Sequence, residues 1–459
     1  MSLDISVLLF TYNCGQIIHP TSTVRDALRS VLDITAGNAN TARLPDLIFL
    51  SLQELAPIHD IFLWGATDKY LTPFIDAVTY LHDGHGDSDD DNDYDNPVYD
   101  LVTAVSSGLT FGLLFSHASS VKISNLESTS VSYGYFQTGL KGAAGVRVSV
   151  SSSSSSSHTP VQATFVAAHL AANEGFKSVR DDNFKTIARK MAFSPSSRSV
   201  TQPQLLPGED RQFLYKDNTY IFFLGDLNYR VALRRQSQSQ AIPAEVGGKV
   251  PKWTRPRDGF VHDWLALDEL TSSRTNDQAF FGFSEPDVTF EPTYKFSLKH
   301  KYSAKRIPSW CDRILYLGDG VNVLSYESIP QIRESDHIPV ACLITIPTST
   351  SPGRLRPDLV KSLEQNDIAA DSFVTQLAQA TTMARGGGSP TQQIDTTLRA
   401  KQILLQDAHI AARRGKLRYI EFAIGAFVYF FLTAMGRGIL LAGIVGLFSF
   451  YMYLRTVWV

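Results

Sequence analysis

Residues 222–230 read FFLGDLNYR, an apolar run that ends in an acid and an amide two positions apart, Asp226 and Asn228. In an extended chain, residues two apart point to the same side. An acid and an amide placed in this way can orient a water molecule and hold a phosphoryl oxygen. The same Gly-Asp-x-Asn pattern is also typical of a turn closed by a side-chain hydrogen bond. The stretch alone therefore leaves a catalytic and a turn interpretation open.

Two further stretches favour the catalytic interpretation. Residues 306–315 read RIPSWCDRIL and residues 335–340 read SDHIPV. Together with the first stretch they resemble the signature of the inositol polyphosphate and phosphoinositide 5-phosphatases, which belong to the endonuclease/exonuclease/phosphatase superfamily. The resemblance covers roughly residues 3–346. The remaining parts of the pattern follow in the family's order, at Asn13, Glu54, His169 and residues 290–296, FEPTYKF, whereas Phe223-Leu224 replaces the family's tryptophan before the Gly-Asp pair.

Each matching residue has a role that its chemistry allows. Asp226 can orient or deprotonate the attacking water, Asn228 can bind a phosphoryl oxygen, and His169 and His337 can donate hydrogen bonds to the developing charge. The resemblance implies that Asp312 pairs with His337 and fixes its ring. Mg²⁺ prefers oxygen ligands and keeps several waters, so we expect Glu54 to bind it directly, with Asn13 nearby and Asp336 close to the metal.

The expected substrate contacts are mostly cationic. Tyr294 with Lys295, and Lys305, match the family's contacts to a 4-phosphate. A lysine ammonium on a flexible side chain suits a phosphate that is bound but not hydrolysed. Arg230 and Arg313 complete the set, although for Arg313 a supporting role is favoured. The expected reaction is removal of the 5-phosphate of a phosphoinositide, with PI(4,5)P2 converted to PI4P. A membrane-bound sphingomyelinase-like phosphodiesterase and a catalytically silent phosphoinositide-binding tether are the alternatives.

These residues must be positioned by a sheet framework. Short apolar runs with polar residues at one end occur at 5–10, 47–52, 165–168, 220–224, 314–317 and 340–346, and helical spacing at 23–33 and 178–192. This pattern predicts an α+β fold, a four-layer α/β/β/α sandwich with the site at one rim. Asp-rich residues 83–95 and the serine run 151–157 interrupt it as solvated loop insertions. A calcium loop at 83–95 is the alternative for the first, but the Gly and Glu expected at fixed offsets are missing.

Composition limits the class of protein. The 459 residues carry 42 Lys+Arg and 45 Asp+Glu, a net charge of 42 − 45 = −3, which argues against a nucleic-acid partner. Three cysteines are too few for a disulfide framework and suit a reducing compartment. Hydrophobic residues at 44% predict a mainly globular protein. The sequence indicates no obligate protein partner.

The C-terminal part changes in character. We expect the catalytic domain at 1–348, a flexible linker at 349–397, a basic amphipathic segment at 398–418 and a hydrophobic helical membrane anchor at 419–459. Between 422 and 454 only Arg437 is charged. The 17 apolar-rich residues 438–454 would reach roughly 26 Å as a helix, which suits a thin bilayer such as the endoplasmic reticulum. A single span, a re-entrant hairpin and a buried soluble helix are the alternatives; the first two place the catalytic domain in the cytosol.

Overall fold

The fold is given by a computed structural model of the chain. It describes residues 4–36, 44–64, 66–82, 96–133, 140–153, 160–195, 213–232, 264–297, 300–303, 306–348, 352–366, 368 and 422–433, with positions 438–439, 443–444 and 447. The run 83–95, the segment 398–418 and most of 419–459 lie outside these residues, and the expectations for them stay predictions.

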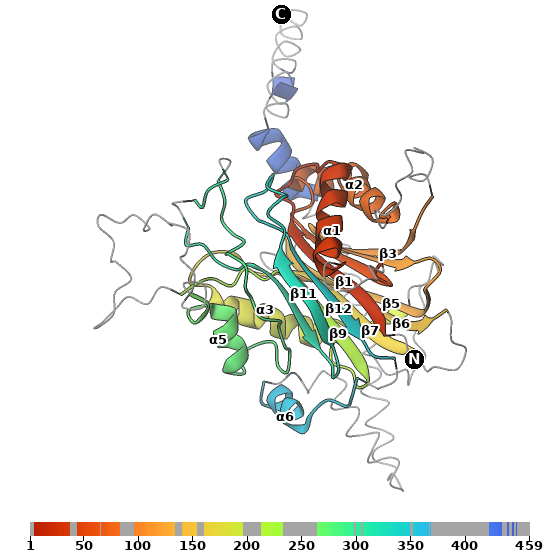
Figure 1. Cartoon of the computed structure of the whole chain (residues 1–459). Helices are drawn as coiled ribbons and strands as arrows, with labels where there is room; N and C mark the ends of the chain where they lie inside the picture. The colour runs from red at the N-terminus through yellow and green to blue at the C-terminus, as the bar shows by residue number, and fades with distance from the viewer. Residues whose placement is uncertain are drawn as a thin grey trace, which may run out of the picture.

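Two six-stranded mixed sheets form the centre of the molecule (Figure 1). The first has the order β11-β12-β1-β2-β4-β3, and the second has the order β10-β9-β7-β6-β5-β8. The strands of the first sheet are β1 (Ile5–Asn13), β2 (Leu47–Gln53), β3 (Tyr99–Ser107), β4 (Thr110–His117), β11 (Asn322–Ser328) and β12 (Val340–Ile346). Those of the second are β5 (Val121–Tyr133), β6 (Lys141–Ser152), β7 (Val161–His169), β8 (Ser194–Pro195), β9 (Thr219–Asp226) and β10 (Asp312–Leu317).

The central strands are apolar on both faces because each face meets another layer. In β1, Val7 and Leu9 point into the core between the sheets, whereas Leu8 and Phe10 point outward. The ring centroids of Phe49 and Phe165 lie 5.2 Å apart and join the two sheets across that core.

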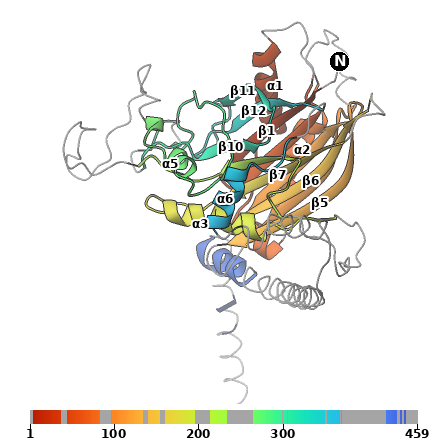
Figure 2. The same ribbon diagram turned by 90° about the horizontal axis from the view of Figure 1, so that it is seen from below.

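Helices cover the two outer faces, on opposite sides of the stacked sheets (Figure 2). The first sheet is covered by α1 (Thr21–Ala36) and α2 (Asp68–Thr79), and the second by α3 (Lys177–Lys190), α5 (Glu269–Thr275) and α6 (Pro357–Gln365). Short π-helical turns are formed by Asp60–Trp64 and Val428–Leu432. The expected four-layer α/β/β/α sandwich is confirmed.

Two boundaries differ from the sequence-based expectation. Residues 352–368, expected in the linker, include α6, which begins at Pro357 and buries Leu359 and Leu363 against the second sheet. The folded body therefore continues past residue 348. The serine run also begins inside a strand, because Ser151 and Ser152 still pair in β6.

The described part of the C-terminal segment lies against the body near α2. The ring of Tyr429 is 5.8 Å from that of His59, in the helical turn that follows Glu54. Figure 1 shows this segment, in blue, beside α2. Within the part of the chain that the structure describes, none of the helices has both the length and the apolar character needed to cross a bilayer.

Candidate active site

The strand register brings the expected site residues to one rim. β1 and β2 run parallel with Asn13 opposite Gln53, so Glu54 follows beside Asn13. In the other sheet His169 lies opposite Asp226, and Asp226 lies opposite Asp312. Because the carboxyl ends of parallel strands share an edge, residues far apart in sequence meet there.

Gly225 allows this close approach. A Cβ at that position would lie 1.8 Å from the carbonyl oxygen of Ala168 on the neighbouring strand. Glycine therefore lets β9 deliver Asp226 directly beside His169. In this motif Gly225 allows the strands to pack closely, whereas Asp226 and Asn228 are the residues with side chains that could take part in the reaction.

Asp226 is buried and contacts both sheets. Its Oδ2 accepts a hydrogen bond from Asn13 Nδ2 at 3.0 Å and lies 3.1 Å from His169 Nε2. Its Oδ1 accepts from the backbone N–H of Asn228 at 3.0 Å. The same bond confirms the predicted turn and is compatible with the catalytic interpretation, which stays a prediction.

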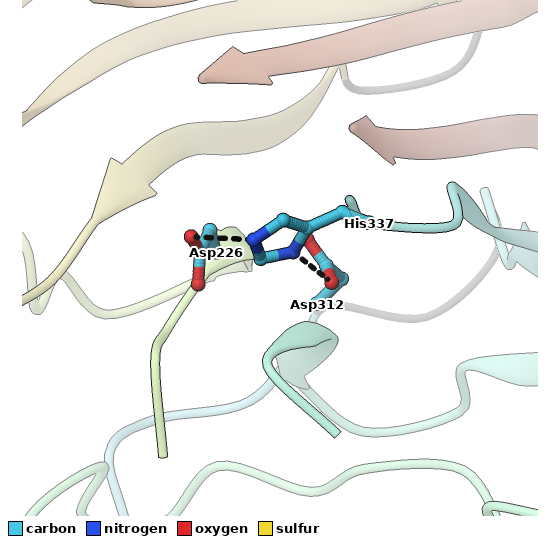
Figure 3. A group of neighbouring side chains, drawn as sticks. All are labelled: Asp226, Asp312 and His337. Carbon is cyan, nitrogen blue, oxygen red and sulfur yellow. Dashed lines mark hydrogen bonds and ion pairs between the residues drawn. The ribbon is translucent and has the colours of Figure 1, made fainter. Parts of the chain in front are cut away.

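His337 lies between two carboxylates (Figure 3). Its Nδ1 is 2.8 Å from Asp312 Oδ2, and its Nε2 is 3.8 Å from Asp226 Oδ2. Asp312 also accepts a hydrogen bond from Thr293 Oγ1 at 2.7 Å, which fixes the carboxylate behind the ring. The expected pairing of Asp312 with His337 is present.

The two histidines differ in charge. Burial by itself would lower the pKa of His337, but Asp312 and Asp226 outweigh it and raise the pKa to about 9. Burial lowers the pKa of His169, and the neighbouring Lys141 lowers it further. Burial would raise the pKa of Asp226, but His337 and His169 hold it well below its usual range. At neutral pH the site therefore contains a carboxylate, an imidazolium and a neutral imidazole.

Glu54 is the residue whose surroundings fit a divalent cation. Its side chain is 32% exposed, and its Oε2 accepts a hydrogen bond from Gln16 Nε2 at 3.3 Å. The Lys141 and His169 nitrogens stop 3.9 Å from its Oε1, too far for hydrogen bonds to that oxygen. Burial would raise the pKa of Glu54, but His169 and Lys141 outweigh it, so the carboxylate is ionised. A single carboxylate with room for water is the donor set that Mg²⁺ uses in proteins.

The other candidate ligands are already engaged. Asn13 Oδ1 accepts from the Gly15 N–H at 3.2 Å, and Asp336 Oδ2 accepts from Lys295 Nζ. Asp226, Asp312 and His337 place ligand atoms within 4.8 Å of one another. Since the ring nitrogens of His337 face two carboxylates, Asp312 through a hydrogen bond and Asp226 as an ion pair at 3.8 Å, this group is better explained as a relay of charged side chains than as a metal centre. The metal roles of Asn13 and Asp336 stay predictions.

The expected substrate residues do not all lie at the site. Tyr294 lies beside the relay, with its ring centroid 4.6 Å from that of His337, and Lys295 is half-exposed next to it. Lys305 lies outside the described residues. Arg313 has the surroundings of the supporting role that the sequence favoured and not those of a substrate contact, because its guanidinium forms a buried ion cluster with Glu285 at 2.6 Å and Asp268 at 3.0 Å. It supports the fold and does not contact the substrate side of the site.

Lys141 was missed by the sequence analysis. It begins β6, its Nζ contacts His169 Nε2, and it lies 3.9 Å from Glu54 Oε1. A lysine that opens a strand of small residues has no local pattern to mark it. The antiparallel register of Gly142 with His169 brings it into the site.

Comparison with known proteins identifies relatives that are named as inositol phosphate and phosphoinositide phosphatases. The chain is 31% identical over 208 residues to the polyphosphatidylinositol phosphatase INP53 of Saccharomyces cerevisiae, which is 44% of this chain and 16% of that protein. It is 29% identical over 316 residues to the type II inositol 1,4,5-trisphosphate 5-phosphatase of Mus musculus, which is 67% of this chain and 27% of that protein. The chain thus matches about a quarter or less of the length of these two relatives.

One solved structure has a similar fold, the inositol polyphosphate 5-phosphatase domain of spsynaptojanin in complex with inositol (1,4)-bisphosphate and a calcium ion. The TM-score is 0.55 at 23% identity, covering 84% of this chain and 94% of that one. The model of the family described as "Endonuclease/Exonuclease/phosphatase family 2" matches residues 10–343, which include the site residues from Asn13 to His337. The chain belongs to this family.

Proposed function

We propose that this protein hydrolyses the 5-phosphate of phosphoinositides, with PI(4,5)P2 as the leading substrate and PI4P as the product. The observation that carries the proposal is the buried Asp226, whose Oδ2 lies 3.0 Å from Asn13 Nδ2, 3.1 Å from His169 Nε2 and 3.8 Å from His337 Nε2. The relatives named as polyphosphatidylinositol and inositol trisphosphate phosphatases support the same substrate class.

The protonation states suit water attack on a phosphate monoester. An Asp226 carboxylate with so low a pKa is a weak base, so its main contribution is to orient the attacking water. The His337 imidazolium can donate a hydrogen bond to a phosphoryl oxygen as negative charge develops. Asn228 Nδ2 donates to the Leu170 carbonyl at 3.2 Å and has a second N–H for a phosphoryl oxygen.

A divalent cation, Mg²⁺ in our proposal, would be held by Glu54. When bound, it supplies neutralisation of phosphate charge and stabilisation of the leaving oxygen. Glu54 is well placed for this, since it lies 3.9 Å from His169, which in turn lies 3.1 Å from Asp226.

Selection of the 4-phosphate is assigned to Lys295. Burial would lower the pKa of Lys295, but the hydrogen bond to Asp336 outweighs it, so the ammonium is charged. Its side chain is 35% exposed, and it can exchange the Asp336 carboxylate for a phosphate. A charged Lys295 that can bind the 4-phosphate favours a substrate with both a 4- and a 5-phosphate over one with a 5-phosphate alone.

Membrane placement is also a proposal. The apolar residues between 422 and 454 would hold the protein on a membrane, in our proposal the endoplasmic reticulum, with the catalytic domain in the cytosol. The contact between Tyr429 and His59 would keep this segment close to the helical turn after Glu54. A tethered enzyme meets a lipid headgroup at a higher local concentration than a soluble inositol phosphate.

The test is phosphate release from a panel of inositol lipids and soluble inositol phosphates, with and without Mg²⁺. We expect release from PI(4,5)P2 that needs the metal and falls about 10²- to 10⁴-fold in Asp226→Ala. Asp182→Ala, at an exposed position of α3, is the matched control and should be fully active. Full activity in Asp226→Ala would overturn the assigned mechanism. Cleavage of sphingomyelin would support the phosphodiesterase alternative, and binding without turnover would support the silent tether.

A further inference from the structure

Arg230 has a buried guanidinium whose contacts are to the protein itself. The residue is 3% exposed, and its Nη2 donates to the side-chain oxygen Oδ1 of Asn228. Its Nε donates to the backbone carbonyl of Asn228 at 3.0 Å. One arginine therefore binds both oxygens of the neighbouring amide residue.

These bonds fix which way the Asn228 amide faces. Oδ1 is covered by a cation, so a rotated amide would place its NH₂ group against the guanidinium, which has no acceptor. The Nδ2 group bonds to the Leu170 carbonyl on the other side. Asn228 also has a φ of +57°, a left-handed conformation that needs support from its surroundings. In this arrangement Asn228 offers the site only a donor, as a phosphoryl oxygen requires.

Arg230 is itself held in place. Its guanidinium carbon lies 4.2 Å from the ring centroid of Tyr294, the residue beside Lys295. Its backbone N–H donates to Glu269 Oε2 at 3.2 Å, and the same oxygen accepts from Arg180. The arginine thus connects the loop that carries Asn228 with the loop that carries the expected 4-phosphate contacts.

We propose that Arg230 is a positioning residue, which acts through Asn228, is held in place by Tyr294 and does not contact the substrate. The proposal differs from the expectation that Arg230 binds substrate, and it rests on the proposed phosphatase function. Lysine cannot replace it fully, because a point charge cannot reproduce the planar fork that reaches both Asn228 oxygens.

The experiment compares full-length wild type, Arg230→Met, Arg230→Lys, Asn228→Ala and the double variant Asn228→Ala/Arg230→Met on PI(4,5)P2 with Mg²⁺. For Arg230→Met we expect kcat to fall about 10²-fold or more while KM stays within about twofold, as for a residue that acts on the transition state only. Arg230→Lys should recover part of kcat. In the Asn228→Ala background, Arg230→Met should cost almost nothing further. Arg356→Met, at an exposed position, is the control.

The competing outcome is a direct contact with substrate. The remaining nitrogen, Nη1, is buried and makes no hydrogen bond to the described residues, so it is the atom that would make such a contact. KM rising about tenfold with kcat unchanged, or losses that multiply with Asn228→Ala, would overturn the proposal. Circular dichroism and urea unfolding would show whether each variant is folded. A wild type inactive on every inositol phosphate would instead contradict the proposed function.

Discussion

Asp226 and His337 keep opposite charges although both are buried, because each stabilises the other's charged form. Asp312 is essential to this, since its carboxylate lies 2.8 Å from His337 Nδ1 and is backed by Thr293. His337 is charged below its pKa of about 9 and neutral above it. A hydrogen-bond donor to phosphate is therefore weakened as the pH rises.

We expect kcat/KM to fall as the pH rises through about 9. In Asp312→Asn the falling limb should move to lower pH by on the order of 1–3 units, because the strongest source of the raised pKa is removed. The measurement is a pH–rate profile of both proteins at saturating Mg²⁺. If kcat/KM fell at the same pH in wild type and in Asp312→Asn, His337 would not be the titrating group.

Lys295 allows a test of headgroup selection. We expect Lys295→Ala to weaken hydrolysis of substrates with a 4-phosphate at least tenfold, and to leave substrates without one nearly unchanged, since the ammonium has only that group to neutralise. Steady-state rates on PI(4,5)P2 and on a 5-phosphate lipid provide the comparison. Lys301→Ala, at an exposed lysine of the same loop, is the control. Equal losses on both lipids would refute the headgroup contact.

Strands and the loops after them position the site, and the sequence indicates this only in part. The apolar runs predict the strands and show which polar residues follow them. The side chains that the register adds from other elements carry no local signal, as with Lys141 on β6 and the partners Glu285 and Asp268 of Arg313. Arg313 lies within the site motif, directly after Asp312, yet successive strand residues point to opposite faces, so its side chain lies on the other side of β10.

Arg313→Met should destabilise the fold and spare the chemistry. It would leave the Glu285 and Asp268 carboxylates buried without their cation, at a cost of about 3–5 kcal/mol. Urea unfolding measures this loss, and activity per folded molecule should stay close to wild type. Arg274→Met removes the partly exposed partner of the same Glu285 and should cost about 1 kcal/mol or less. A stable Arg313→Met protein with a raised KM would restore Arg313 as a substrate contact.

The molecule as a whole combines a folded body with a C-terminal apolar segment. The body extends at least to α6, and the apolar residues begin some fifty positions later. If that segment is the membrane attachment, removing it should change location and leave the site intact.

Deleting residues 420–459 should release the protein from membranes without lowering its activity on a short-chain soluble substrate. Fractionation of cells that express the full chain and the deletion variant measures location, and phosphate release measures activity. The catalytic site contacts described here lie within 13–337, which is why turnover should persist. Continued sedimentation with membranes would show that another segment attaches the protein.

The pairing of β1 with β12 has a consequence for how the protein is made. Seven consecutive residue pairs join Ile5–Thr11 to Val340–Ile346. Strand β1 is therefore synthesised long before β12, its partner in the sheet. His337 and Asp312 also arrive late, whereas Asn13 and Glu54 leave the ribosome early. A nascent or prematurely terminated chain consequently has no complete site. Hydrolysis of the proposed lipid substrate would therefore begin only after nearly the whole described body has been synthesised.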